Sequence, residues 1–184
     1  MSHPNLLDSS DTVLVVIDAQ DAFLKTIFER ERVVANTVRL IEAAKVFSVP
    51  ILVTLQNAPK LGDCTGAVMD ALPHDTRIEK MSFSCCGCER FPGALEETTR
   101  RQALLCGVES HICVSQTAHD LLARGYSVHV AKDAVSSRTP ESWLVGVEKM
   151  RDSGCVITST EMAIFELTGD ASSEEFKRIL PLVR

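Results

Sequence analysis

The sequence predicts an α/β protein: a three-layer α/β/α sandwich around a mostly parallel sheet. Two observations predict this class. Short apolar runs, typical of strands that are buried on both faces, recur along the chain, and segments with helical spacing of apolar residues separate them. Strands that alternate with helices form right-handed βαβ units, whose helices cover both faces of a parallel sheet. The length of 184 residues and the 45% hydrophobic content suit a single domain over residues 1–184.

The elements follow one another in regular alternation. Residues 13–18 (Val-Leu-Val-Val-Ile-Asp) predict a buried strand, and residues 31–47 predict the helix after it, because apolar side chains recur there at roughly helical spacing. Further strands are predicted over residues 51–55, 77–81, 103–106, 127–131 and 155–159, and further helices over residues 112–123, 141–152 and 173–180. Residues 56–75 are predicted to form a loop. Ligands of such sheets bind at the carboxyl ends of the strands, near a topological switch point.

The net charge and the hydropathy of the chain argue against two classes of partner, nucleic acids and membranes. The net charge is −6 and the basic residues are scattered, so nucleic acid is not an expected partner. The first residues lack the basic and apolar regions of a signal peptide, and no apolar run approaches the roughly 20 residues needed to span a bilayer. We therefore expect a cytoplasmic protein that does not bind membranes and acts on a small molecule.

The seven cysteines are expected to be reduced thiols, because their number is odd and a chain of this length needs no disulfide framework. Three of them form the cluster Cys85, Cys86 and Cys88. Structural zinc sites use two C-x₂-C-like pairs, and the remaining candidates, Cys64 and His74, supply no fitting second pair. Packing within a loop, redox sensing and, last, zinc binding stay open for this cluster.

Three residues could carry chemistry together. Cys113 falls where a buried strand runs into a helix, with Ser110 as a plausible N-cap, and the free amides and dipole of a first helical turn favour thiolate. Asp18 ends the first buried strand, where a carboxylate needs a partner. By spacing alone, Cys113 could be a small core residue, Asp18 a helix cap and Lys80 a surface charge. Together they supply a nucleophile, a proton acceptor and a cation.

Four segments of the chain form a specific pattern. They are Val15-Val16-Ile17-Asp18-Ala19-Gln20, Glu79-Lys80 before the loop around Ser84, Gly107-Val108-Glu109-Ser110-His111-Ile112-Cys113-Val114, and Asp133-Ala134-Val135-Ser136-Ser137-Arg138. Over roughly residues 10–165 the chain resembles the isochorismatase-like cysteine hydrolases. The resemblance implies the isochorismatase-like hydrolase fold and a homo-oligomer, and it requires no cofactor.

The resemblance also implies a role for each site residue. Cys113 is the nucleophile, Asp18 the base that takes its proton, and Lys80 the cation that holds both. The peptide bond between Val108 and Glu109 is cis, and the backbone amides of Glu109 and Cys113 form an oxyanion hole.

The pattern departs from two branches of the family. Nicotinamidases carry Asp and His metal ligands after the second strand, but residues 56–60 (Gln-Asn-Ala-Pro-Lys) offer no such His, so we expect neither a metal site nor nicotinamide as substrate. True isochorismatases lack the nucleophilic cysteine. The presence of Cys113 therefore predicts hydrolysis of an amide, carbamoyl or ureido C–N bond through an acyl-enzyme.

Other functions stay open at this point. They are isochorismatase-type vinyl-ether hydrolysis, a thiol redox or sensor protein that uses the cysteine cluster, and a member of the fold that only binds a ligand. The candidate substrate-binding residues are Gln20, Phe23, Phe83 and His111, although aromatic residues at such positions are as often part of the core.

Self-association can be tested directly. Small α/β domains commonly pair symmetrically, so we expect size-exclusion chromatography with light scattering to give a species larger than the 20.1 kDa chain. A single species of one chain's mass at micromolar concentration would contradict this prediction.

Overall fold

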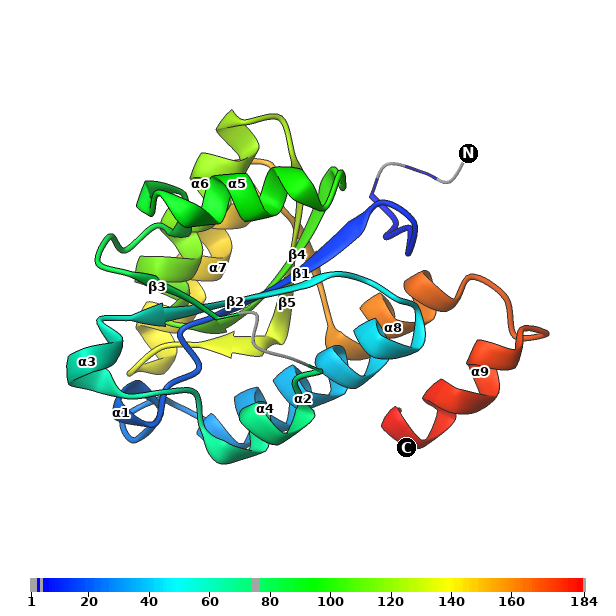
Figure 1. Cartoon of the computed structure of the whole chain (residues 1–184), viewed down its shortest axis with the longest axis horizontal. Coiled ribbons are helices and arrows are strands. Elements are labelled where there is room, and N and C mark those ends of the chain that lie inside the picture. Colours follow the sequence, from blue (N-terminus) through cyan, green and yellow to red (C-terminus); the bar gives the residue numbers. More distant parts are fainter. Residues whose placement is uncertain (1–2, 4, 74–76, 184) are drawn as a thin grey trace.

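A six-stranded sheet forms the middle layer of the protein in the computed structural model, which describes residues 3, 5–73 and 77–183 (Figure 1). The strands are β1 (Thr12–Ile17), β2 (Ile51–Gln56), β3 (Arg77–Lys80), β4 (Gln102–Val108), β5 (Ser127–Ser136) and β6 (Val156–Thr158). Their order is β3-β2-β1-β4-β5-β6, and every neighbouring pair is parallel. The predicted fold class is confirmed.

Helices cover both faces of this sheet (Figure 1). One face carries α5 (Arg90–Glu97), α6 (Ser115–Ala123) and α7 (Pro140–Asp152); the other carries α2 (Arg30–Val46), α4 (Gly66–Ala71), α8 (Thr160–Thr168) and α9 (Glu174–Ile179). Successive side chains of a strand point to opposite faces, so Val13 and Val15 belong to the first core layer and Leu14 and Val16 to the second. This double burial explains why the strands are continuous apolar runs.

The chain order creates a switch point between β1 and β4. From β1 the chain winds outward through β2 to β3, then returns to β4 on the other side of β1 and winds outward to β6. The connections after β1 and after β4 therefore run in opposite directions. Open α/β sheets bind ligands between the carboxyl ends of two such strands. Asp18 directly follows β1 and Cys113 lies shortly after β4, so the topology brings them to the same place.

Some predicted elements were wrong in type or extent. Residues 56–75 are not one loop, because α3 (Ala58–Leu61) and α4 lie within them; at four and six residues these helices are too short to show periodicity. We did not predict α5, whose Pro92 and Gly93 resemble a turn, although a proline is tolerated in a first helical turn. Helix α8 was also missed, as was the short α1 (Asp21–Leu24). The helix predicted from residue 112 begins as a π turn, Ser110–Val114, and becomes regular only in α6.

The surface carries no helix suited to a bilayer within the described residues: none is long and apolar enough to cross a membrane. Several large apolar side chains are nevertheless exposed, namely Leu6, Met81, Phe83, Leu144, Val145, Met162 and Phe165. Self-association stays a prediction.

One buried histidine makes the stability of the fold depend on pH. His129 of β5 is fully buried, its Nδ1 has no hydrogen-bond partner among the described residues, and burial lowers its pKa from 6.5 to about 4. Between pH 6.5 and about pH 4, His129 binds a proton in the unfolded chain but not in the folded chain. Stability is therefore fully present above about pH 6.5 and falls as the pH drops toward 4, by about 3 kcal/mol in total.

We expect His129→Gln to flatten this dependence in urea unfolding measured between about pH 7 and pH 4. His3→Gln, which changes an exposed histidine, is the matched control. An unchanged slope in His129→Gln would show that other groups cause the acid sensitivity.

Candidate active site

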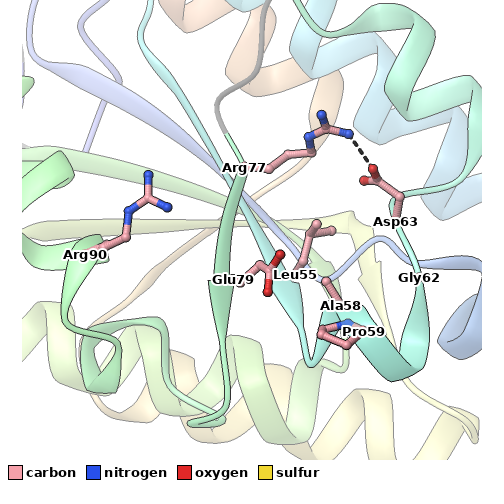
Figure 2. A pocket seen from close by; sticks show the side chains of 8 residues that line it. All are labelled: Leu55, Ala58, Pro59, Gly62, Asp63, Arg77, Glu79 and Arg90. Carbon is pink, nitrogen blue, oxygen red and sulfur yellow. Dashed lines mark hydrogen bonds and ion pairs between the residues drawn. The ribbon is translucent and has the colours of Figure 1, made fainter.

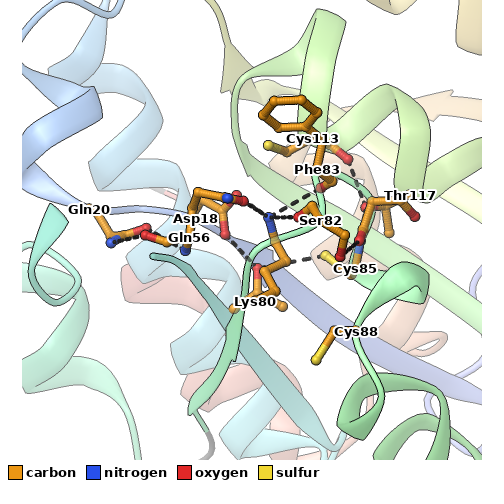
Figure 3. A network of polar contacts seen from close by, with 12 residues as sticks. Asp18, Gln20, Gln56, Lys80, Ser82, Phe83, Cys85, Cys88, Cys113 and Thr117 are labelled. Carbon is orange, nitrogen blue, oxygen red and sulfur yellow. Dashed lines mark hydrogen bonds and ion pairs between the residues drawn. The ribbon is translucent and has the colours of Figure 1, made fainter. Parts of the chain in front are cut away.

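The three predicted catalytic side chains come from the carboxyl ends of three different strands (Figure 3). Asp18 follows β1, Lys80 is the last residue of β3, and Cys113 lies in the π turn after β4. All three are buried, with exposed fractions of 0%, 3% and 6%. Lys80 is thus not a surface charge, the alternative that its spacing had left open.

A buried ion pair forms the centre of the site. Lys80 Nζ lies 2.6 Å from Asp18 Oδ2, and Thr54 Oγ1 donates a 2.8 Å hydrogen bond to the other carboxylate oxygen. Lys80 Nζ also donates to Gln56 Oε1 at 2.8 Å and reaches the main-chain oxygens of Phe83 (3.1 Å) and Ser82 (3.3 Å). Buried ion pairs are tolerated only when such additional bonds offset the loss of water. Here the network spans β1, β2 and β3.

Gln20 supports this network, and its predicted role as a substrate contact is not supported. Its side chain is fully buried, and its Nε2 donates to the main-chain oxygens of Gln56 (3.0 Å) and Gly62 (2.7 Å). Its Oε1 accepts from the Gln56 amide at 2.8 Å. Both amide hydrogens are used, so Gln20 positions Gln56, which in turn holds Lys80.

Sequence reasoning missed Thr54 and Gln56. Both lie near the carboxyl end of the buried strand Ile51–Gln56, where a polar side chain must find a partner just as Asp18 must. The same argument that selected Asp18 could have found them.

Burial controls the protonation of Cys113. It raises the pKa of the thiol to about 12; the negative charge of Asp18 and a hydrogen bond with that carboxylate add to the increase, and the positive charge of Lys80 opposes it. The expectation that this turn favours thiolate is therefore wrong for the free protein, because the first amides of a helix do not outweigh desolvation and a nearby anion. At neutral pH the thiol is protonated and sits beside a carboxylate.

The turn that carries Cys113 is held by close backbone contacts. The peptide bond between Val108 and Glu109 is cis. Gly107 has φ +109°, and a Cβ there would lie 2.0 Å from the main-chain oxygen of Ile17 in β1. A Cβ on Gly146 of α7 would lie 2.8 Å from the His111 amide nitrogen. Only glycine permits both approaches, so β1 and α7 hold the turn from two directions.

The hydroxyl of Ser110 does not cap a helix, contrary to prediction. It lies 2.7 Å from Ser137 Oγ, which is also 2.8 Å from His111 Nδ1. Since the chain passes through a π turn here, the first regular helical turn starts later, after Val114. The segment from Asp133 to Arg138, one of the four that carry the family resemblance, is for the most part the end of β5. Arg138 leaves this strand and donates to Glu109 Oε2 from its Nε (3.0 Å) and its amide (3.2 Å).

The remaining candidate substrate contacts differ in accessibility. The Phe83 side chain is 55% exposed, so it can meet a ligand. Met81 lies on the same loop and is 71% exposed, although the sequence did not indicate it as a candidate substrate contact. His111 is half-buried and bonded to Ser137, and Phe23 is half-buried against the small core cluster around Leu24.

Comparison with known proteins now identifies the family: residues 12–162 match the family described as "Isochorismatase domain". The chain belongs to the isochorismatase family of hydrolases. "Secreted isochorismatase effector Isc1" of Phytophthora sojae is 39% identical over 94% of this chain and 84% of its own length. "Isochorismatase domain-containing protein 2" of Danio rerio is 35% identical over 96% of this chain and 89% of its own.

A solved structure agrees with this assignment. The "MAR1 Ribonuclease from Caenorhabditis elegans" superimposes with a TM-score of 0.91 at 32% identity, covering 97% of this chain and 92% of that one. The names of these relatives thus include a secreted protein and a ribonuclease. Each name describes that relative. The cytoplasmic location of this isochorismatase-family chain stays a prediction.

The cysteine cluster of this isochorismatase-family hydrolase lies beside the network rather than in a metal site. Cys85 and Cys86 are buried in a 3₁₀ turn, and Cys88 is half-buried with its Sγ 3.3 Å from the Glu79 main-chain oxygen. Burial raises the pKa of Cys85 to about 12. Within the described part of the chain, no three His, Cys, Asp or Glu side chains are grouped to hold a metal. His74 lies outside the described residues.

A charged cavity of about 710 Å³ lies at the outer edge of β3 (Figure 2). Arg77 and Glu79 of β3 line it together with Asp63 and Arg90, and Arg77 pairs with Asp63. None of the three proposed catalytic residues lines this cavity, so its volume carries no information about the substrate.

The ion pair predicts opposite effects of its two members on the thiol. Asp18→Asn removes the charge and the hydrogen bond that raise the Cys113 pKa, so we expect Cys113 alkylation by iodoacetamide at about pH 9 to become at least about tenfold faster. Lys80→Met removes the opposing cation and should slow alkylation at every pH. Mass spectrometry of the Cys113 peptide separates this signal from Cys88.

Each single change leaves one buried charge without its partner, which costs about 3–5 kcal/mol. Asp18→Asn/Lys80→Met removes both charges, and circular dichroism checks that all three variants fold. Superimposable alkylation profiles in folded variants would show that neither charge acts on the thiol.

Proposed function

We propose that this isochorismatase-family hydrolase cleaves an amide, carbamoyl or ureido C–N bond of a small molecule through an acyl-enzyme on Cys113. The observation that carries the proposal is the buried pair of Asp18 and Lys80, 2.6 Å apart, beside a protonated thiol. A nucleophile, a base and a group that orients the base are the parts that covalent catalysis needs.

The reaction begins with proton transfer. As the Cys113 sulfur attacks the substrate carbonyl carbon, its proton passes to Asp18 and the carbonyl oxygen takes up the negative charge. Collapse of this intermediate breaks the C–N bond, and the departing nitrogen takes the proton from Asp18, which leaves a thioester. Water then attacks the thioester while Asp18 accepts its proton, and this proton returns to the sulfur as the acid product leaves.

A thiol pKa of about 12 determines when the first proton transfer occurs relative to the attack of sulfur on the carbonyl carbon. A free thiolate would be scarce at neutral pH, because the carboxylate is far too weak a base to deprotonate such a thiol on its own. Transfer is therefore coupled to the formation of the C–S bond, which removes the charge from sulfur as it develops. Lys80, bonded to Asp18, orients the carboxylate before the attack.

The developing oxyanion is assigned, as part of the proposal, to the backbone amides of Glu109 and Cys113. Donors aimed at the oxygen where charge develops act most strongly in a water-excluded site, and the burial of both residues supports this assignment. Phe83 and His111 are the candidate substrate contacts of this proposal. No step of this mechanism requires a cofactor or a metal.

Vinyl-ether hydrolysis is the second candidate. The word isochorismatase in the name of the Phytophthora sojae relative favours it. It needs protonation of the substrate but no covalent cysteine. Loss of the Cys113 thiol would abolish C–N hydrolysis and spare vinyl-ether hydrolysis.

RNA cleavage, suggested by the name of the Caenorhabditis elegans structure, is less well supported. Lys80, the cation of the network, already has four oxygen acceptors for its three hydrogens and none to spare for a phosphate. The net charge of −6 also opposes a polyanion.

A panel of small amides, carbamoyl compounds and ureides, scored by ammonia release, tests the proposal. We expect Cys113→Ala to abolish turnover and Lys80→Met to lower kcat/KM by a factor of order 10² or more, because the base loses its partner. Mass spectrometry of the enzyme quenched during turnover should show the acyl adduct on the Cys113 peptide.

Cys88→Ala and Lys60→Met are the matched controls, since among the described residues Cys88 Sγ bonds only to the Glu79 main-chain oxygen, and Lys60 is exposed. Activity that survives in Cys113→Ala but not in Cys88→Ala would overturn the assignment and favour the thiol redox alternative. Isochorismate and a short RNA complete the panel, and turnover of either in Cys113→Ala would favour that substrate class.

A further inference from the structure

A second cavity, of about 420 Å³, opens at the opposite edge of the sheet from β3. Residues of β6, of α7 and of the start of α8 contribute to its lining: Ile157, Trp143 and Met162. The charged residues of the lining are Arg32, Lys132, Glu29 and Asp133, and Thr158 and Ser159 complete it. None of the proposed catalytic residues lines this cavity, and neither the fold nor the proposed reaction explains its composition.

Two cations share one aromatic ring in this cavity. The Trp143 ring, from the one tryptophan of the chain, has Arg32 Cζ 5.2 Å and Lys132 Nζ 5.2 Å from its centroid. Each cation is attracted to the ring, so two positive charges lie within 5.2 Å of the centre of one aromatic side chain.

Two hydrogen-bond donors of the same residues have no acceptor. Arg32 uses its Nε for Glu29 Oε2 (2.6 Å) and its Nη1 for the Asp133 main-chain oxygen (2.5 Å). Its Nη2 and Trp143 Nε1 are buried and have no partner among the described residues. Buried donors without acceptors are destabilising and rare in native proteins. Their coincidence at one cavity indicates a missing acceptor.

The two carboxylates of the lining, Glu29 and Asp133, bond to other groups and accept from neither Arg32 Nη2 nor Trp143 Nε1. The Glu29 carboxylate is paired with Arg32, and Asp133 Oδ1 accepts from the amide (2.8 Å) and hydroxyl (3.0 Å) of Thr160 at the start of α8. Within the described residues Lys132 Nζ forms neither a hydrogen bond nor an ion pair, and its one recorded contact is with the ring. An anionic group is therefore the acceptor that fits.

We propose that this cavity binds a small molecule that carries one carboxylate on a compact apolar body. The carboxylate takes the two free donors and the Lys132 charge, and the body lies against Ile157 and Met162. Met162 is 54% exposed without such a ligand. The volume lies within the range of small-molecule sites, which combine apolar walls with a few placed polar groups. This proposal is independent of the reaction proposed for Cys113.

The single tryptophan makes the site directly observable. We expect hexanoate, butanoate or cyclohexanecarboxylate to change the Trp143 fluorescence of the full chain in a saturable manner, and hexanamide, which lacks the charge, to leave it unchanged. Lys132→Met should weaken hexanoate binding about tenfold or more, as expected for loss of a charge-assisted contact. Lys149→Met, which removes an exposed cation from the same helix as Trp143, should bind like the wild type.

Calorimetry of Trp143→Phe, which keeps a ring but removes the Nε1 donor, tests the hydrogen bond and should also show weaker binding. Three outcomes would overturn the proposal: no saturable response to any of the three carboxylates, equal responses to hexanoate and hexanamide, or unchanged affinity in both Lys132→Met and Trp143→Phe. A fluorescence change on dilution of the protein, with no response to carboxylates, would instead assign the cavity to contact with a second copy of the chain.

Discussion

The ion pair between Asp18 and Lys80 is the constraint on which the rest of the site depends. Its members follow β1 and end β3, and Thr54 and Gln56 of the intervening strand bond to one member each. Removing either charge would leave the other buried without compensation, which typically costs about 3–5 kcal/mol, a large part of the stability of a domain. The pair therefore ties the carboxyl ends of three strands together while it arranges the proposed base.

Burial, together with this pair, determines the protonation of the resting thiol. Burial and the Asp18 carboxylate raise the pKa of Cys113, and Lys80 only partly opposes them. A protonated thiol is a poor target for oxidation, since susceptibility follows thiolate character and exposure. The site thus separates two properties that are often assumed to go together: the sulfur lies beside the proposed base, but its protonated form is a poor target for oxidants.

The sequence predicted those parts of this arrangement that depend on local patterns. Continuous apolar runs determined the fold class, and a carboxylate at the end of one such run identified Asp18. Lys80 was assigned by family resemblance, because its neighbours along the chain give no sign of its burial. The support that Gln20 gives to Gln56, and the cavity around Trp143, arise from contacts between segments far apart in the chain, for which no local pattern exists.

The loop after β3 contributes to the site through its backbone rather than its side chains. The main-chain oxygens of Ser82 and Phe83 accept from Lys80, and that of Met81 accepts from Gln56 Nε2 at 2.8 Å. The side chains of Met81 and Phe83 point outward, 71% and 55% exposed. Evolution can therefore vary residues 81 and 83 to change substrate preference while the charged network keeps its geometry, and a combinatorial library at these two positions is a practical route to altered specificity.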